Sequence, residues 1–338
     1  MKKLVVYAIL SIVLIASLTP VTAHSKNQVV VVVTFSYLAP DVERLLCNGV
    51  VYAIVPAGVD PHEYQLKPSD IDVLKKADII ISTAHTHFEL DIRDHVENGE
   101  LNAELVEVTE INGLEIKTNP STKQLNYHMP INDPLNYLLF LEEITRKLAS
   151  LDPENKACYY EKYVETASII VREVLVHKGK YSGKVVVDKP HAQYLVEWLG
   201  LQVVQVLKAE EEYQVTPGDI EKIQELARSG ELIGVVVTEP SVDPVAYKLL
   251  EIASQYNVTV LRVNSPSKTS GILENLEKLV SQLNQLENRE FKSKVESSTN
   301  KLLSIGEIIG LSILAIGIGF TIGYLYTSRK QRKSGEVY

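Results

Sequence analysis

Apolar positions in the first half of the chain come in short runs separated by amphipathic stretches. The runs are rich in valine and isoleucine and cover residues 29–34, 50–55 and 79–82, with helical patterns near 39–47 and from Ser69 onward. Short β-branched runs bounded by glycine and proline predict buried strands, and their alternation with helices predicts a parallel sheet. The first half is therefore expected to form an α/β lobe.

A second alternation of the same kind follows later in the chain. Its apolar runs cover residues 184–188, 203–207, 234–238 and 258–263, with helical patterns at 192–199, 217–228 and 244–256. The connector between the halves begins with Asp152-Pro153-Glu154-Asn155, which suits a capped helix start, and no glycine or proline interrupts it up to about Lys178. This predicts two α/β lobes joined by one long helix of about 26 residues and ~39 Å, with two helices and a break as the alternative.

Both ends of the chain carry apolar stretches of a different kind. Met1-Lys2-Lys3, the apolar run 4–18 and the small residues up to Ala23 match a signal peptide at 1–23. Residues 308–326 hold no charge, are long enough to span ~30 Å of hydrocarbon and are followed at once by a basic cluster. We expect an extracytoplasmic body anchored in the cell membrane by a C-terminal transmembrane helix, with a cytoplasmic basic tail at 327–338.

The net charge limits the kinds of ligand that the protein can bind, and the cysteines bear on lipid attachment and disulfide formation. The chain has a formal net charge of −9, and without the +2 of the leader lysines and the +3 of the tail the body carries −14. This argues against nucleic acid and suits a cationic ligand, although the same charge also serves solubility. Only Cys47 and Cys158 occur, and neither follows the leader, where a lipid would be attached. Their helical, partly apolar surroundings favour two buried free thiols over a disulfide.

One histidine stands out in the first lobe. His62 follows the predicted strand 50–55 in a segment rich in glycine and proline, and Ser69 is a suitable N-cap for the next helix. His62 is therefore expected in a loop at a strand exit, where α/β scaffolds commonly carry binding residues. A loop histidine with no role beyond polarity is an equally good interpretation at this point.

Several short motifs surround this loop and recur further along the chain. They are Gly58-Val59-Asp60-Pro61-His62-Glu63-Tyr64 with Pro68-Ser69-Asp70, the run Lys76-Ala77-Asp78, Asp152-Pro153-Glu154-Asn155 with Tyr159 and Tyr160, and Glu239-Pro240. Through them, residues 28 to about 286 resemble the cluster A-I substrate-binding proteins of zinc, manganese and iron ABC importers. In that family two α/β lobes joined by one long helix hold a metal ion in the cleft between them. The resemblance implies an N-terminal lobe at 24–150, a linking helix at 151–180, a C-terminal lobe at 181–286 and a polar linker at 287–307.

The resemblance implies a function in metal uptake. Such a protein captures a divalent transition metal outside the membrane and delivers it to the permease of an ABC importer. Histidine ligands favour Zn²⁺, with Mn²⁺ or Fe²⁺ as alternatives, and binding by neutral imidazoles should weaken as the pH falls through the histidine range. No H-E-x-x-H helix is present, so an enzyme is not expected. A surface adhesion or sensor protein with weakened metal binding is the alternative.

The resemblance also implies ligand positions. His62 is the first, and His128, in Tyr127-His128-Met129-Pro130, is the second. The third position falls on Lys189, whose protonated ammonium has no lone pair for a metal, so His191 is favoured, with Asp188 as the alternative. The fourth position, an aspartate in the family, falls on Asn264.

Three other residues are weaker candidates. Glu239 is expected to orient a ligating histidine rather than to bind metal. His85 and His87 follow the strand 79–82 in the segment T-A-H-T-H-F-E. An H-x-H pair on a strand would point to one face, but two polar loop residues are the favoured interpretation. The expected ligands are thus His62, His128 and His191, with Asp188, Glu239, His87 and Asn264 as further candidates.

Overall fold

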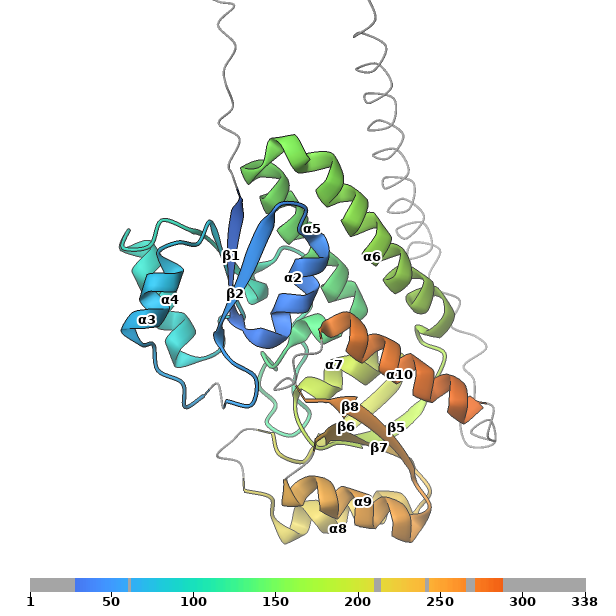
Figure 1. Cartoon of the computed structure of the whole chain (residues 1–338). Coiled ribbons are helices and arrows are strands. Elements are labelled where there is room, and N and C mark those ends of the chain that lie inside the picture. The colour runs from blue at the N-terminus through green and yellow to red at the C-terminus, as the bar shows by residue number, and fades with distance from the viewer. Residues whose placement is uncertain (1–27, 60–61, 210–213, 241–242, 266–270, 288–338) are drawn as a thin grey trace, which may run out of the picture.

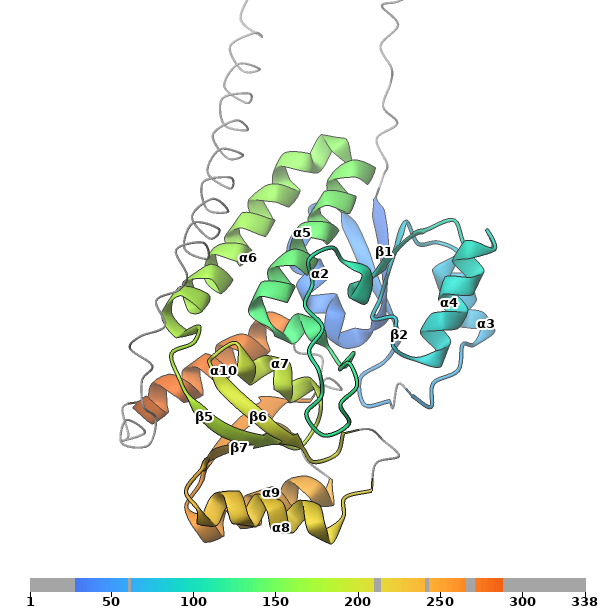
Figure 2. The same cartoon turned by 180° about the vertical axis from the view of Figure 1, so that it is seen from behind.

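Two lobes make up the protein in the computed structural model, and the long helix α6 (Lys156–His177) runs beside them (Figures 1 and 2). The structure describes residues 28–59, 62–209, 214–240, 243–265 and 271–287. Each lobe contains one four-stranded sheet, and every strand pairing in both sheets is parallel. The prediction of an α/β fold with two parallel-sheet lobes is confirmed.

The sheet of the first lobe has the strand order β2-β1-β3-β4. Its strands are β1 (Val29–Phe35), β2 (Gly49–Val55), β3 (Ile79–Ser82) and β4 (Glu104–Glu107). One face is covered by α2 (Ala39–Leu45) and α5 (Pro134–Leu151), and the other by α3 (Pro68–Leu74) and α4 (His87–Glu97), as Figure 1 shows. Helices on both faces explain why β1 is almost wholly apolar and buried. Sequence reasoning missed β4, because four residues reading E-L-V-E form no apolar run.

The sheet of the second lobe has the analogous order β6-β5-β7-β8. Its strands are β5 (Gly183–Val187), β6 (Leu201–Val206), β7 (Leu232–Glu239) and β8 (Thr259–Asn264). The face toward the first lobe carries α7 (His191–Glu197) and α10 (Ile272–Glu287), and the opposite face carries α8 (Pro217–Arg228) and α9 (Pro244–Tyr256) (Figure 1). In both lobes the chain passes from the first strand (β1 or β5) to a neighbour on one side (β2 or β6). It then crosses to the neighbour on the other side (β3 or β7). Loops at the carboxyl ends of such strands are the usual binding positions of open α/β sheets.

Four short 3₁₀ helices complete the described structure, at Ser36–Leu38, Val108–Glu110, Pro130–Asn132 and Pro153–Asn155. The last of them leads directly into α6, which is continuous, so the alternative of two helices with a break does not apply. α5 and α6 pack side by side (Figure 2). This helical pair connects the lobes without a flexible strand linker.

The two lobes share one hydrophobic core. A single cluster of buried side chains runs from the first sheet through α5 and α6 to α7 and α10, while a second cluster lies under α8 and α9. A buried carboxylate reinforces the contact between the lobes: Asp41 on α2 accepts hydrogen bonds from the Tyr137 hydroxyl at 2.5 Å and from the Ile272 backbone N–H at 2.6 Å. Gly271 permits this approach, since a Cβ there would lie 2.7 Å from the carboxylate. Asp41 thus caps the start of α10 from the other lobe.

Cys47 and Cys158 form a disulfide, so the prediction of two free thiols is wrong. Cys47 lies between α2 and β2, Cys158 lies in the first turn of α6, and their Cα atoms are 6.1 Å apart. The two residues are 111 positions apart, and only the packing of α2 against α6 brings them together. Local sequence around each cysteine holds no information about that contact.

The two expected membrane-related segments, 1–23 and 308–326, lie outside the described residues. Among the residues that the structure describes, no helix is both long and apolar enough to cross a membrane.

Candidate metal centre

The loop after β2 carries His62, as predicted, at a strand exit. The helix that follows, α3, begins at Pro68 with Lys67 as its N-cap, so the prediction of Ser69 as the N-cap is wrong. The Asp70 carboxylate accepts the Lys67 backbone N–H at 2.9 Å and so satisfies the first amide of this helix start. The buried Tyr64 donates its hydroxyl to the same carboxylate at 2.8 Å. The Tyr64 bond fixes the loop two residues after His62, whose own side chain is exposed.

The loop after β3 carries His85 and is built around one buried carboxylate. Glu89, in the first turn of α4, is fully buried and accepts backbone N–H groups of Thr83, His85 and Thr86 at 2.7–3.1 Å. Four hydroxyl groups also donate to it, from Thr34, Ser82, Thr83 and Thr86. This many donors compensates the cost of burying a carboxylate. The loop is thereby folded tightly, with Ala84 at a left-handed φ of +56°, and presents His85 away from the strand.

The third histidine, His128, lies at the end of a loop that is bonded to the second lobe. We call residues 115–128 the His128 loop. Hydrogen bonds join this loop to α7 and β6: Tyr194 accepts the Lys117 N–H at 2.9 Å, Gln193 donates to the Thr118 carbonyl at 3.0 Å, and Ser121 donates to the Val206 carbonyl at 2.8 Å. The loop belongs to the first half of the sequence, but these hydrogen bonds attach it to the second lobe.

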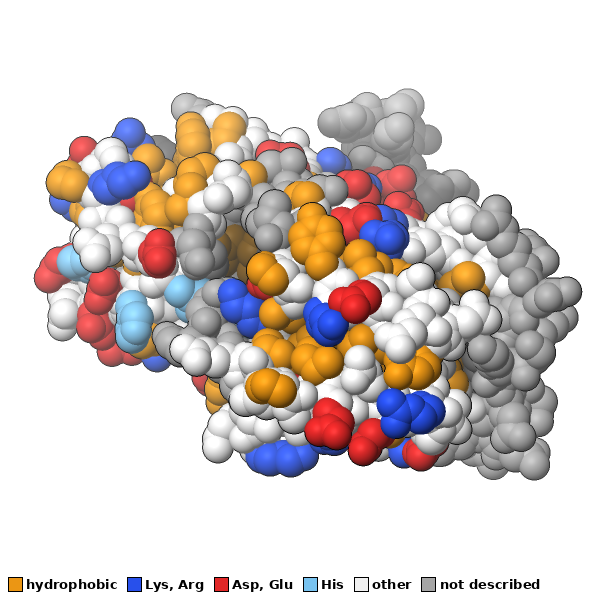
Figure 3. All heavy atoms as spheres, turned by 90° about the horizontal axis from the view of Figure 1, so that it is seen from below, with side chains coloured by type: hydrophobic (Ala, Val, Ile, Leu, Met, Phe, Trp, Pro, Cys, Tyr) orange, Lys and Arg blue, Asp and Glu red, His pale blue; other side chains and the backbone are white. Residues whose placement is uncertain are grey.

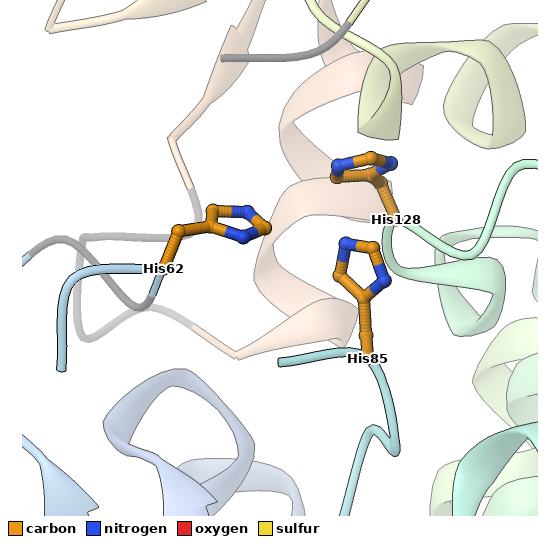
Figure 4. Close-up of side chains that lie close together, drawn as sticks. All are labelled: His62, His85 and His128. Carbon is orange, nitrogen blue, oxygen red and sulfur yellow. The ribbon is translucent and has the colours of Figure 1, made fainter. Parts of the chain in front are cut away.

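The three histidines converge in space (Figure 4). His62, His85 and His128 each offer one ring nitrogen, and these atoms all lie within 4.8 Å of one another. The ring centroids of His85 and His128 are 4.3 Å apart, and those of His62 and His85 are 5.3 Å apart. Nitrogen atoms bound to one Zn²⁺ ion lie about 2.0–2.1 Å from it, so small side-chain movements would complete a common site.

The electrostatics of the cluster keep its inner histidines neutral. Burial, followed by the charge of His62, lowers the pKa of His85. Burial, followed by the charges of His85 and His62, lowers the pKa of His128 to about 3. A neutral imidazole has the lone pair that a metal needs. Protonation of these two residues is therefore moved below the ordinary histidine range.

One buried nitrogen atom of the cluster makes no hydrogen bond among the described residues. His85 Nε2 is buried and has no hydrogen-bond partner among the described residues. A buried polar atom without a partner costs free energy, so such atoms usually mark an ion, a water or a function. A lone pair here, between His62 and His128, fits a metal ligand.

The structure does not bring His191 into this cluster, although it was the favoured third ligand. Its side chain is buried at the start of α7, and its Nε2 lies 3.3 Å from the Thr238 hydroxyl. Burial, followed by the charge of Lys189, lowers its pKa to about 3. Asp188 is also engaged within the lobe, because it accepts both the Thr238 N–H at 2.7 Å and the Thr238 hydroxyl at 2.8 Å. The third histidine of the cluster is His85 rather than His191.

The remaining candidates also lie outside the cluster. Glu239 accepts hydrogen bonds from Arg262 and Lys278, and no bond to a histidine is found among the described contacts. Asn264 accepts from the Lys278 ammonium at 2.6 Å. His87 is exposed at the start of α4, on the helix rather than in the tight turn that presents His85. The H-x-H segment thus contributes one ligand candidate, and the prediction favoured neither of its histidines.

Histidine side chains also reach the surface close to this region. The view from below shows them on the side of α3 and α4, next to a hollow between that side and the rest of the protein (Figure 3). Of the three cluster histidines, His62 is the exposed one.

Comparison with known proteins identifies the family. The model for the zinc-uptake complex component A, a periplasmic protein, matches residues 31–288. The chain belongs to this family. Members of the zinc-uptake component A family are substrate-binding transport proteins rather than enzymes, in agreement with the prediction.

Relatives of the chain within this family are distant in sequence. The manganese ABC transporter substrate-binding lipoprotein scaA of Streptococcus gordonii is 23% identical over 239 residues, which are 66% of this chain and 75% of the relative. A metal ABC transporter substrate-binding lipoprotein of Lactococcus lactis is 25% identical over 238 residues, 65% of this chain and 74% of the relative.

Solved structures show the same fold. A manganese-bound periplasmic metal-binding protein of Candidatus Liberibacter asiaticus has a TM-score of 0.60 at 19% identity, covering 77% of this chain and 99% of the other. A variant of the laminin-binding adhesin of Streptococcus agalactiae has a TM-score of 0.59 at 20% identity, covering 76% and 98%.

Proposed function

We propose that this chain captures a divalent transition-metal ion with His62, His85 and His128 and delivers it to the permease of an ABC importer. The observation that carries the proposal is the convergence of three imidazoles from three separate segments, with ligand atoms within 4.8 Å of one another. The metal is cargo, so it must be bound and later released. Family membership and the names of the relatives support the same role.

The ligand set favours Zn²⁺ over Mn²⁺ or Fe²⁺. Imidazole nitrogen suits zinc, whereas manganese prefers carboxylate and other oxygen ligands. Within the described residues the cluster contains three histidines and no carboxylate. Several relatives, scaA of Streptococcus gordonii among them, are named as manganese proteins, so zinc preference would separate this chain from them. Three nitrogens leave one of the four positions of tetrahedral zinc to water or to a group of the permease.

An adhesion or sensor role with weakened metal binding has less support. That alternative rested on the loss of family ligands in the second lobe, at Lys189 and Asn264, and on the permanent membrane anchor. His85 supplies a third nitrogen from the first lobe and compensates for that loss.

We further propose that the protein works outside the membrane and is held there by residues 308–326. The charge-free run and the basic cluster after it support this assignment. The proposed division is a leader at 1–23, lobes at 24–150 and 181–286 with the linking helix 151–180 between them, a polar linker at 287–307 and a tail at 327–338. Carbonate extraction of membranes tests the anchor: the full chain should stay with the membranes, and a chain ending at residue 300 should be released. Release of the full chain would contradict it.

Metal loading of the full chain in detergent tests the function. The protein is stripped with a chelator, incubated with Zn²⁺, Mn²⁺ or Fe²⁺ and analysed for bound metal, with affinities from competition against chelating dyes. We expect one ion per chain and the tightest binding for Zn²⁺. No uptake of any of the three metals above background would refute the proposed function, and tighter binding of Mn²⁺ would refute the choice of metal.

A further inference from the structure

Asn126 connects His128 to the second lobe through its side chain. It is almost completely buried, at 1% exposure. Its Oδ1 lies 3.1 Å from the His128 backbone N and 3.2 Å from His128 Nδ1. Its Nδ2 donates to the Pro190 carbonyl and to Gln193 Oε1, both at 2.9 Å.

The orientation of this carboxamide is determined by its partners. The Pro190 carbonyl can only accept, so the atom that faces it must be the amide nitrogen. The backbone N–H of His128 can only donate, so the atom that faces it must be the amide oxygen. Both ends of the side chain give the same answer, which removes the usual ambiguity of asparagine flips.

The amide orientation in turn determines the protonation of the His128 ring. Asn126 Oδ1 has no hydrogen to donate, so the hydrogen between it and His128 Nδ1 must come from the ring. A neutral imidazole carries one hydrogen, which leaves the lone pair on Nε2. Figure 4 shows one ring nitrogen of His128 turned toward His62, and one turned away from it.

We propose that Asn126 is the positioning residue of the metal site: it selects the tautomer in which His128 Nε2 faces the metal, and it ties this ligand to the start of α7 in the second lobe. The inference rests on the proposed metal-binding function. Residues that hold the second nitrogen of a ligating histidine usually affect metal affinity strongly although they do not touch the metal. Two ligands thus come from first-lobe loops, and the third is held by the second lobe.

The tautomer is tested first, on the metal-free full chain in detergent, labelled with ¹⁵N at its histidines. Two-bond proton–nitrogen NMR spectra distinguish the two tautomers, and the His128 signal is identified by its loss in His128→Gln. We expect hydrogen on Nδ1 in the wild type and in Asn126→Asp, which keeps an acceptor oxygen, and a tautomer mixture in Asn126→Ala. Hydrogen on Nε2 in the wild type would overturn the proposal. This result needs no bound metal, so it is separable from failure of the proposed function.

Zn²⁺ affinity is measured next on the same proteins, with circular dichroism to establish that each variant is folded. Asn126→Ala should bind roughly 10- to 100-fold more weakly than the wild type. Ser121→Ala is the matched control, because it removes both hydrogen bonds between the Ser121 hydroxyl and the Val206 backbone of the second lobe, each 2.8 Å, without touching His128. It should stay within about threefold of the wild type. Equal affinities of the wild type and Asn126→Ala, or an equal loss in both variants, would overturn the positioning role.

Discussion

The two lobes have the same sheet topology but use the carboxyl ends of their strands differently. In the first lobe, the loops after β2 and β3 direct His62 and His85 toward a shared space. In the second lobe, the polar residues at the ends of β5 and β8 bond to their own lobe: Asp188 and His191 to Thr238, and Asn264 to Lys278.

This difference shows that the strand order determines where binding residues can lie, but not whether their polar atoms are available to a ligand. A polar residue at a strand exit is available to a ligand only if its neighbours leave its donor or acceptor atom open. In the second lobe one threonine, Thr238, contacts the polar side-chain atoms of both Asp188 and His191. The second lobe contributes instead by holding the loop that carries His128. Four experiments can break or sharpen this comparison, from the largest expected effect to the smallest.

The disulfide ties only the first lobe to the linking helix, so its removal tests how independent the lobes are. Replacing both cysteines by serine should lower the free energy of unfolding by about 4 kcal/mol, because the bond closes a loop of roughly 110 residues in the unfolded chain. Urea unfolding is followed by circular dichroism for the whole protein and by fluorescence of Trp198, the single tryptophan, in the second lobe. Since the lobes share a core, we expect both curves to shift together. A shift of the dichroism curve alone would indicate that the lobes unfold separately.

Removal of single ligands tests the assignment of the site. His62→Ala, His85→Ala and His128→Ala should each weaken Zn²⁺ binding by roughly 100-fold, since about 10–16 kcal/mol of zinc binding is shared among some four ligands. The control is His87→Ala, which removes an exposed histidine two positions from His85 and should leave affinity unchanged. Equal effects of His85→Ala and His87→Ala in the dye competition assay would exclude His85 as a specific ligand.

The buried contact between the lobes should give the metal-free protein an unusual pH dependence. Burial raises the pKa of Asp41 to about 6, against the lowering effect of the Tyr137 hydrogen bond. A carboxyl with a raised pKa stabilises the fold below its unfolded pKa, and this contribution is lost as the pH rises toward 6. The stability of the wild type relative to Asp41→Asn should therefore fall by about 2 kcal/mol between pH 4 and pH 7.

Denaturant titrations at several pH values measure this difference. Glu63→Gln serves as the control, because Glu63 is an exposed carboxylate of the same lobe and should give no such trend. A difference between the wild type and Asp41→Asn that does not change with pH would mean that Asp41 stays charged at the lobe contact.

The smallest effect on metal binding is expected in the second lobe. Asp188→Asn and His191→Gln should cost about 1–3 kcal/mol of stability, because each disturbs buried hydrogen bonds around Thr238. Their Zn²⁺ affinity should remain within about threefold of the wild type, because neither residue is part of the histidine cluster. A loss near 100-fold in His191→Gln would instead make His191 a ligand and the two lobes equal partners in the site.

Much of the fold was predictable from the sequence, because strands and helices depend on patterns that are local in the chain. The apolar runs correspond to seven of the eight strands, and the uninterrupted helical pattern after Asn155 corresponds to α6. His62 was identified because a specific motif surrounds it. His128 was predicted by the same resemblance.

The sequence by itself thus determined the two α/β lobes, their order and the strand exits where binding residues lie, because hydrophobic periodicity and turn residues act over a few positions. Only the tertiary structure decided which polar groups are open to a metal. Glu89 shapes the turn that presents His85, and Thr238 contacts the ring of His191. The packing of two helices brings Cys47 to Cys158. Each of these outcomes depends on partners distant in the chain or on side-chain geometry, and no local pattern encodes them.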